Sequence, residues 1–403
     1  MNLIDKKCSF CCKSSLYELF DFGLVPHVNK FYKTKDKDLE KFYPLVLVVC
    51  SNCFLVQLTE SISNNEMFLE YHHRSSASKG NVEYLESLSS LIYKNHKDKK
   101  ILEIGSNDLT LFNNLLDKGL DIYGVEPAMN LFPKNKKIFN NFLNIENVKK
   151  IKKQFGTFDM LLGINVFAHN SNFKELFESA EKLLNEHGII HIEVAYALKT
   201  VLKGNYDTIY HEHFCSYTLC SLEKILNSYN LNIIDAEELS TQGGSLRVVA
   251  VKSHKDKKTT GSDNYLKIKE KEERLGLNNI KFYEKASNEI SKKFNKVKKF
   301  FDEVNNDIVF IGAPARGVVT LNSQKLQLMN NINFFDDTPE KLNLCFPGFD
   351  YIVKSWDNKI LNNYKYAFIL SWNYSDYLIN RLKASNYKGK VVVPFPEFKV
   401  FTI

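Results

Sequence analysis

Hydrophobic and polar positions along the chain form short apolar runs that alternate with amphipathic stretches. Residues 101–104 are a largely apolar run of the kind that forms a buried parallel strand. Gly105 then allows a tight turn, and residues 121–125 form a second strand-like run. Between them, apolar side chains recur at helical spacing, at Leu111, Leu115 and Leu116. This order predicts a strand–helix–strand unit of a parallel sheet.

The same pattern continues to the end of the chain. Further strands are expected at residues 158–162, 188–194, 231–237, 307–311, 332–336, 366–372 and 391–394. Residues 280–301 carry apolar side chains at three- and four-residue spacing, which predicts one long amphipathic helix that packs against the core. Strands that alternate with helices indicate an α/β protein. We expect three parts, at residues 1–73, 74–254 and 255–403.

An acidic residue ends the second predicted strand. Glu126 follows Gly105 by 21 residues, where a ribose hydroxyl pair lies in a doubly wound sheet. The G-x-G-x-x-G fingerprint of nicotinamide-binding folds is missing at this turn. Glu103 before the glycine and the pair Glu126-Pro127 resemble the class I S-adenosylmethionine methyltransferases instead. The alternative is an ordinary strand–helix–strand unit that binds no cofactor.

Two C-x-x-C pairs lie in the first part of the chain. Cys8 and Cys11 form the first pair, and Cys50 and Cys53 form the second. Four thiolates at this spacing predict a zinc site, and because they leave no open position we expect the metal to be structural. Cys12 is a spare thiol that could replace Cys11. The alternative is four unrelated reduced cysteines.

Polar side chains are crowded in the segment Tyr210-His211-Glu212-His213, just beyond a predicted strand end. Histidine can take up a proton near neutral pH, glutamate could orient a partner, and tyrosine could donate a hydrogen bond to a developing oxyanion. His169 follows another strand and is expected to face the same site. The two histidines of the H-x-H pattern could alternatively bind a metal. Alternation along a strand would aim His211 and His213 to one side and the other two side chains to the opposite side.

A glycine-bounded turn in the third part, at residues 312–317, leads into a helix that reaches Asn322. The start of such a helix can bind a phosphate through its backbone N–H groups, with Arg316 nearby. We therefore expect substrate contacts at Arg316, Gly312 and Asn322.

Composition narrows the function further. The 403 residues carry a formal net charge of +7 without one concentrated basic face, which argues against nucleic-acid binding and remains compatible with an anionic small substrate. No apolar run approaches the ~20 residues that span a bilayer. The N-terminus lacks the pattern of a signal peptide, so we expect a cytoplasmic protein with reduced cysteines and no membrane partner. The oligomeric state is not readable from the sequence, and we favour a monomer.

Taken together, these motifs resemble the sugar C-methyltransferases that act on nucleotide-linked 4-keto-deoxysugars. The resemblance covers nearly the whole chain and includes the paired C-x-x-C, G-S-N-D at 105–108, N-V-x-A-H at 165–169, Y-H-E-H-F at 210–214, G-G-S-L-R at 243–247, G-A-P-A-R-G at 312–317 and P-x-P-E at 394–397. It implies an α/β fold in which a class I methyltransferase Rossmann-like domain is flanked by an N-terminal zinc-binding module and a C-terminal Rossmann-like, substrate-binding domain.

The resemblance also implies roles for individual residues. His213 is expected to act as base at the carbon beside the ketone, surrounded by Tyr71, His169, Tyr210 and Glu212. S-adenosylmethionine is the expected cofactor beside a structural zinc. Its expected contacts are Glu103, Gly105, Asn107, Asp108, Glu126, Pro127 and Asn165.

Two positions depart from the family pattern. Leu109 stands where a second glycine is usual, and a leucine there could crowd the cofactor. Arg316 stands where relatives commonly carry lysine, which keeps the charge and changes its geometry. The leading hypothesis is C-methylation of a nucleotide-linked ketosugar in surface-glycan or deoxysugar biosynthesis. The alternatives are O-methylation of a sugar or related phosphorylated metabolite, and a non-catalytic binding protein with a decayed cofactor site.

Overall fold

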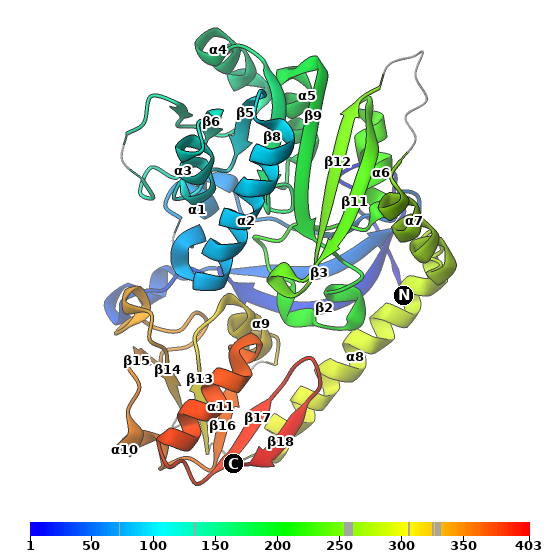
Figure 1. Ribbon diagram of the computed structural model, residues 1–403. Helices are drawn as coiled ribbons and strands as arrows, with labels where there is room; N and C mark the ends of the chain where they lie inside the picture. The colour runs from blue at the N-terminus through cyan, green and yellow to red at the C-terminus, as the bar shows by residue number, and fades with distance from the viewer. Residues whose placement is uncertain (72, 133, 254–260, 305–306, 325, 327–331) are drawn as a thin grey trace.

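The computed structural model contains three β-sheets, arranged along the long axis of the molecule (Figure 1). It describes residues 1–403 except 72, 133, 254–260, 305–306, 325 and 327–331. The expected boundary between residues 254 and 255 lies outside the described residues. The α/β fold with three sheet-based parts confirms the fold class predicted from the sequence.

The N-terminal sheet has the strand order β1-β2-β3-β4-β10, and all its pairs are antiparallel. Its strands are β1 (Leu3–Ile4), β2 (Leu16–Pro26), β3 (Phe42–Cys50), β4 (Val56–Leu58) and β10 (Cys215–Ser216). The last of these comes from the middle of the chain. In Figure 1, β2 and β3 cross the molecule between the central sheet above and the C-terminal sheet below. The N-terminal sheet therefore touches both other parts.

The central sheet has the order β11-β12-β9-β8-β5-β6-β7. Its strands are β5 (Lys100–Ile104), β6 (Asp121–Val125), β7 (Ile138–Phe139), β8 (Phe158–Ile164), β9 (Leu184–Ala195), β11 (Leu231–Leu239) and β12 (Ser245–Lys252). The strands from β5 to β9 are parallel, and the hairpin of β11 and β12 adds an antiparallel edge. The chain order reverses at β5, so its carboxyl end lies at a topological switch point, where α/β sheets bind ligands.

Helices cover both faces of the central sheet because successive side chains of the strands point to opposite sides. Ile101 packs with the helices of one face, and Leu102 belongs to the core of the other face. The first face carries α2 (Lys79–His96) and α3 (Thr110–Asp117), and the second carries α4 (Ile145–Phe155), α5 (Phe173–Leu183) and α6 (Leu219–Ser228). In α3 the expected apolar stripe is only partly right, since Leu111 and Leu115 are buried while Leu116 is exposed.

The C-terminal sheet has the order β15-β14-β13-β16-β17-β18 and is parallel except for its last pair. Its strands are β13 (Ile308–Ile311), β14 (Asn333–Phe335), β15 (Val353–Lys354), β16 (Tyr366–Ile369), β17 (Lys390–Val393) and β18 (Lys399–Thr402), and its helices are α9 (Ala315–Ser323), α10 (Asn358–Leu361) and α11 (Ser375–Ala384). The sequence patterns predicted this Rossmann-like domain but missed β15 and β18.

A long helix connects the two Rossmann-like parts. After α7 (Asp263–Leu275), α8 (Ile280–Glu303) runs down one side of the molecule, as the amphipathic pattern predicted (Figure 1). Its face packs on β2, where the Phe294 and Phe20 rings lie 4.9 Å apart and the Ser287 hydroxyl donates to the Leu19 carbonyl. α8 thus packs against one side of the N-terminal sheet.

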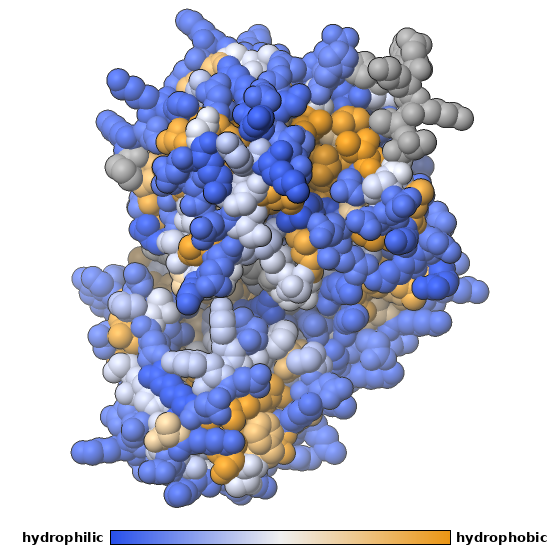
Figure 2. Space-filling model, viewed as in Figure 1, coloured by the Kyte–Doolittle hydropathy of each residue, from blue (hydrophilic) through white to orange (hydrophobic). Residues whose placement is uncertain are grey.

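The surface shown in Figure 2 is mostly hydrophilic, and hydrophobic residues gather in its upper half and near its lower end.

The remaining α-helix of the described residues, α1 (Asn64–Phe68), is short. None of the helices within the described ranges has the length and apolar character needed to cross a bilayer.

Candidate active site

A cavity of about 450 Å³ lies where the three parts of the chain meet. Asn29 of the N-terminal module, Glu126 of the central sheet and Arg316 of the C-terminal domain all line it. On the side of the central sheet, its wall consists of the carboxyl ends of β5, β6, β8 and β9. This position agrees with the ligand-binding edge expected for an open α/β sheet.

The turn after β5 needs glycine. Gly105 has φ +70°, and a Cβ there would lie 2.9 Å from a methyl carbon of Val166. Its N–H donates to the Val125 carbonyl at 2.8 Å, which ties the turn to the end of β6. The backbone can therefore approach a ligand closely at this point.

Glu126 is held at the end of β6 by two backbone groups. One carboxylate oxygen accepts from the Asn107 N–H at 2.7 Å and the other from the Ala128 N–H at 2.9 Å. Burial raises the pKa of Glu126 to about 7, and these two hydrogen bonds act in the opposite direction. Each oxygen keeps a second lone pair, so the carboxylate can also accept from a pair of ribose hydroxyls.

Glu103 has a buried carboxylate oxygen, Oε2, without a hydrogen-bond partner. The residue lines the cavity, and burial raises its pKa well above the usual range. An unpaired buried carboxylate is costly, and a cationic ligand would offset that cost. The ammonium group of S-adenosylmethionine fits this requirement. Pro127 and Asn165 line the same part of the cavity.

Asn107 and Asp108 hold a neighbouring segment in place. The Asn107 side chain lines the cavity and accepts from the Ser75 N–H at 2.9 Å. The Asp108 carboxylate accepts from the N–H and the hydroxyl of Ser76 at 3.0 and 2.6 Å and does not line the cavity. The structure therefore gives Asp108 a role in anchoring the linker that contains Tyr71 and Ser76, in place of the direct cofactor contact that we expected.

Leu109 does not crowd the cavity. Its backbone is left-handed, with φ +65°, as a glycine at this position would readily adopt. Its side chain is buried in the apolar cluster that contains Phe112 and Ile101, and it is absent from the cavity wall. The concern that this leucine blocks the cofactor is thus wrong, because the side chain points into the core.

The segment 210–213 forms a turn that packs against the N-terminal sheet. The His213 N–H donates to the Tyr210 carbonyl at 2.8 Å, which closes the turn. Because the segment is not a strand, Tyr210, Glu212 and His213 all line the cavity. His211 lies apart, with its Nε2 3.1 Å from the Pro44 carbonyl oxygen on β3. The expected strand-like alternation of side chains is therefore wrong.

His213 has a defined proton arrangement. Its Nδ1 lies 2.9 Å from the carbonyl oxygen of Thr208. A carbonyl only accepts, so Nδ1 carries the proton and the lone pair is on Nε2. Burial lowers the pKa of His213 to about 4, and the nearby cation Arg316 acts in the same direction. The imidazole is therefore neutral near pH 7 and has one lone pair that can accept a proton.

Aromatic and acidic side chains surround this imidazole. The Tyr210 ring lies 4.0 Å from the His213 ring, and the His169 ring lies 5.0 Å away and nearly perpendicular. The Tyr71 hydroxyl donates to Glu212 at 3.4 Å. Burial raises the pKa of Glu212 to about 7 and lowers the pKa of His169 well below its usual range. The structure thus brings all five expected catalytic residues to one cavity.

Only one of the three expected substrate contacts lies at the cavity. Arg316 lines it at the start of α9 and stacks over the Trp372 ring, 5.2 Å from its centroid. Gly312 and Asn322 are absent from its wall. Gly312 forms a turn with φ +91° against Ser371, and the buried Asn322 amide donates to the Val318 and Pro347 carbonyls. The latter two are therefore structural.

Lys341 and Asn29 are among the polar residues of the cavity that sequence reasoning missed. Lys341 reaches it from the loop after β14, and its Nζ donates to the Ala313 carbonyl at 2.9 Å. Lys341 follows a predicted strand of the C-terminal sheet, and residues beyond the ends of such strands often line a ligand site, so its position could have indicated the cavity. Asn29 follows β2, a strand that the hydrophobic pattern did not reveal, so nothing in the sequence pointed to it.

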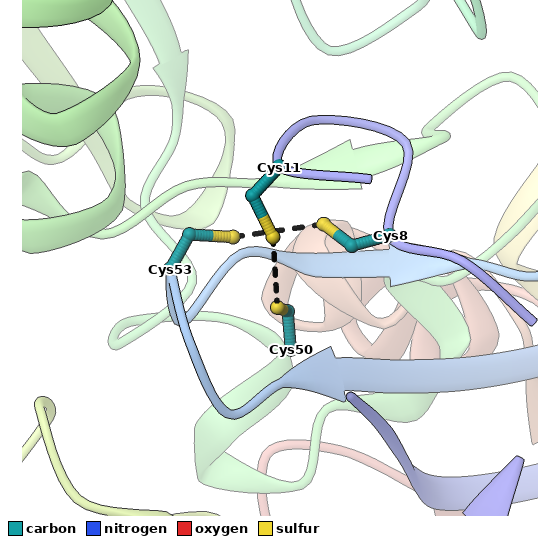
Figure 3. A group of neighbouring side chains, drawn as sticks. All are labelled: Cys8, Cys11, Cys50 and Cys53. Atoms are coloured by element: carbon teal, nitrogen blue, oxygen red, sulfur yellow. Dashed lines mark hydrogen bonds between the residues drawn. The ribbon is translucent and has the colours of Figure 1, made fainter. Parts of the chain in front are cut away.

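The four expected zinc ligands form one cluster (Figure 3). The sulfur atoms of Cys8 and Cys53 lie 3.6 Å apart, those of Cys11 and Cys50 lie 3.5 Å apart, and all four lie within 4.8 Å of one another. Tetrahedral zinc with bonds of ~2.3 Å requires sulfur atoms roughly 3.8 Å apart, so the set fits the ion.

The negative charges of four neighbouring thiolates would also be stabilised by a bound cation. A hydrogen bond to the Cys50 sulfur raises the pKa of the Cys8 and Cys53 thiols. Four thiolates this close together would repel one another, and a bound metal ion offsets that repulsion. Cys12 lies outside the cluster and is exposed. In the described part of the chain no second group of three or more such ligands occurs, and the H-x-H pair is not part of one.

Three family models match consecutive parts of the chain. A zinc-binding domain matches residues 8–68, a methyltransferase domain matches residues 55–236, and the C-methyltransferase C-terminal domain matches residues 240–396. C-methyltransferase NovU of Streptomyces niveus is 24% identical over 409 residues, which cover 98% of this chain and 97% of that protein. The chain thus carries matches to a zinc-binding domain, a methyltransferase domain and a C-methyltransferase C-terminal domain, in this order. It is an S-adenosylmethionine-dependent methyltransferase with a structural zinc site.

Solved methyltransferases resemble less than half of this chain. Magnesium protoporphyrin IX methyltransferase from Synechocystis PCC 6803 is 14% identical with a TM-score of 0.33, covering 43% of this chain and 84% of its own. A methyltransferase from Archaeoglobus fulgidus is 15% identical with a TM-score of 0.36, covering 42% and 94%. Likenesses this low carry no argument about the reaction.

The zinc assignment is testable by elemental analysis. Protein purified without added metal should contain about one zinc per chain, because four thiolates complete a tetrahedral site. The double variant Cys50→Ser, Cys53→Ser should lose the metal. Cys12→Ser is the matched control and should retain it. Zinc that persists in the double variant would contradict the assignment.

We expect the Glu126 carboxylate to accept hydrogen bonds from the ribose hydroxyls of the cofactor. Glu126→Ala should weaken S-adenosylmethionine binding by about 1.5–3 kcal/mol in a calorimetric titration, because hydrogen bonds to a charged group are lost. Asp121→Ala, at the exposed start of the same strand, is the control and should bind normally. Equal affinity of the Glu126 variant and the wild type would mean that the ribose lies elsewhere.

Proposed function

We propose that this enzyme transfers a methyl group to the carbon beside the ketone of a nucleotide-linked ketosugar, in the biosynthesis of a surface glycan or a deoxysugar. The observation that carries the proposal is the neutral, half-buried His213, which lines the same cavity as Glu126 and Arg316 and has its lone pair on Nε2. Bound S-adenosylmethionine supplies an electrophilic methyl group.

Methylation at carbon requires a base. A carbon atom beside a ketone must lose a proton before it becomes nucleophilic, and His213 can accept that proton at Nε2. A pKa of about 4 keeps the imidazole in its base form above about pH 4, so the base is available across the neutral range. The enolate oxygen that forms needs a hydrogen-bond donor.

Tyr210 is suited to that donor role. Its hydroxyl belongs to the cavity wall, and no hydrogen bond to it occurs among the described residues. Burial raises its pKa above the usual range, and the nearby Glu212 charge acts in the same direction. The hydroxyl therefore stays protonated and can donate to a developing oxyanion.

The basic end of the cavity supports a phosphorylated substrate. Arg316 at the start of α9 and Lys341 in the segment after β14 both line the cavity. The charge of Lys341 also lowers the pKa of His73 on the opposite side, after the larger effect of burial. Two cations on separate elements favour an extended anion such as a diphosphate. The four-thiolate zinc site supports a reducing compartment, which agrees with the cytoplasm.

Removing the base should abolish turnover without loss of the cofactor. His213→Asn cannot accept the proton, so turnover should fall by on the order of 10²–10⁴, while calorimetry should show unchanged S-adenosylmethionine affinity. His211→Asn is the matched control in the same turn and should keep most of its activity, since His211 faces β3.

An isotope distinguishes carbon from oxygen as the acceptor. Deuterium at the carbon beside the ketone should be lost to solvent as the product forms, as mass spectrometry would show. A methylated product that retains the deuterium would contradict C-methylation and support O-methylation. Wild-type loss of deuterium in the His213 variant would make another residue the base, with His169 as the next candidate.

The cations of the C-terminal domain should act on the substrate alone. Arg316→Ala or Lys341→Met should raise the substrate KM roughly 10- to 100-fold, because hydrogen bonds to a charged group are lost, and should leave cofactor affinity intact. Arg381→Ala is the control, since that arginine pairs with Asp337 and does not line the cavity. If only cofactor binding changed, the two ends of the cavity would be assigned the wrong ligands.

A further inference from the structure

One side chain of the N-terminal zinc-binding module reaches the catalytic turn. The amide nitrogen of Asn29 donates to Oε1 of Glu212 at 2.7 Å, across 183 residues of sequence. The other carboxylate oxygen accepts from the Tyr71 hydroxyl at 3.4 Å. Glu212 is only 3% exposed. Its two oxygens are therefore held from two different elements.

The backbone around Asn29 fixes the position of this amide. The residue lies in a turn just after β2, where the Lys30 N–H donates to the His27 carbonyl at 3.2 Å. The Asn29 N–H itself donates to a His27 ring nitrogen at 3.3 Å. These contacts place the side chain at the cavity without help from a ligand, so the contact to Glu212 is built into the fold.

The hydrogen bond from Asn29 favours the ionised form of Glu212. An amide NH₂ group only donates, and an ionised carboxylate only accepts. A hydrogen bond to the charged form lowers a carboxyl pKa, and it opposes the burial that raises the pKa of Glu212 to about 7. Near neutral pH the contact with Asn29 thus helps to decide whether Glu212 is ionised.

The charge of Glu212 has a consequence for its neighbours. It raises the pKa of both Tyr71 and Tyr210, in each case after the larger effect of burial. The facing groups are Tyr71 from the linker, Tyr210 from the same turn, and Arg316, whose charge acts on Tyr210 in the opposite direction. An ionised Glu212 therefore keeps the tyrosine hydroxyls protonated, as donors to an oxyanion must be.

We propose that Asn29 is a positioning residue of the methyltransferase, which holds Glu212 ionised and oriented so that the N-terminal module is a working part of the active site. The consequence for turnover rests on the proposed function, because it assumes an oxyanion that forms beside Tyr210. The contact and its effect on Glu212 do not depend on the substrate.

The titration of Glu212 tests the proposal directly. Protein labelled with ¹³C at the glutamate side-chain carboxyl carbon is titrated by NMR, and the signal absent from Glu212→Gln identifies the residue. Its midpoint should lie near pH 7 in the wild type. In Asn29→Ala it should rise by about one pH unit, because one hydrogen bond to the charged form is lost. Asn29→Asp keeps the shape but replaces the donor with an acid, and it should raise the midpoint further.

The control is Asn64→Ala. Asn64 is an asparagine of the same module that lines the same cavity, but its amide donates to Asn170. Its variant should leave the Glu212 midpoint where it is in the wild type. Unchanged midpoints in both Asn29 variants, or an equal rise in Asn64→Ala, would overturn the proposal.

Kinetics then separate this proposal from the proposed function. In Asn29→Ala the acidic limb of the kcat profile should move to higher pH by the same amount as the NMR midpoint, with little change in KM. Movement of the NMR midpoint without any movement of the limb would overturn the catalytic part of the proposal. A wild-type protein that turns over no nucleotide-linked ketosugar would contradict the proposed function, and the NMR titration would still decide the role of Asn29.

Discussion

The active site depends on one short strand pairing. β10 consists of two residues, and it leaves the methyltransferase domain to pair with β4 of the N-terminal sheet. The Leu58 N–H donates to the Phe214 carbonyl at 2.9 Å, so the pairing begins directly after His213. A two-residue strand is not stable alone, and it needs the sheet and the burial that the sheet provides. The turn that carries His213 is thus supported by a strand of another part of the chain.

Burial sets the charge states in this cavity. A buried ionisable group favours its neutral form, so the pKa of a histidine falls and that of a glutamate rises. Both changes occur here side by side, at His213 and Glu212. The histidine is therefore neutral at neutral pH, while the glutamate stays near the midpoint of its titration. The same environment thus gives adjacent residues different charge states.

The sequence predicted the parts of the fold that local patterns encode. The unit from β5 to β6 shows its apolar runs, glycine turn and terminal acid within 26 residues, and each prediction depends on neighbours in the chain. The spacing of the four cysteines likewise predicted the zinc site. Long-range pairings were not predictable in this way. β10 is too short to leave a pattern, and the strand-like reading of its neighbours put His211 on the wrong side.

Side chains that act through tertiary contacts were also missed or misplaced. Asn29 follows a strand that Gly23 and a register shift interrupt, so its alternation is broken. Leu109 looked like a defect in the cofactor site because only the fold shows that its side chain enters the core. In both cases the decisive information is the direction of a side chain in three dimensions, which spacing alone does not give.

The zinc site lies next to the pairing of β4 with β10 that supports the turn 210–213. Cys50 ends β3 and Cys53 precedes β4, so the metal fixes the turn between two strands of the N-terminal sheet. Gln57 on β4 donates to the Cys8 sulfur at 3.2 Å, and the same residue lies opposite Cys215 of β10.

The path from the metal to the base is therefore short, because Cys215 lies two residues after His213 in the chain. Structural zinc contributes about 10–16 kcal/mol of apparent binding energy in small domains, far more than a two-residue strand pairing could supply. A metal with no open coordination position can thus stabilise the strand against which the turn that carries His213 packs.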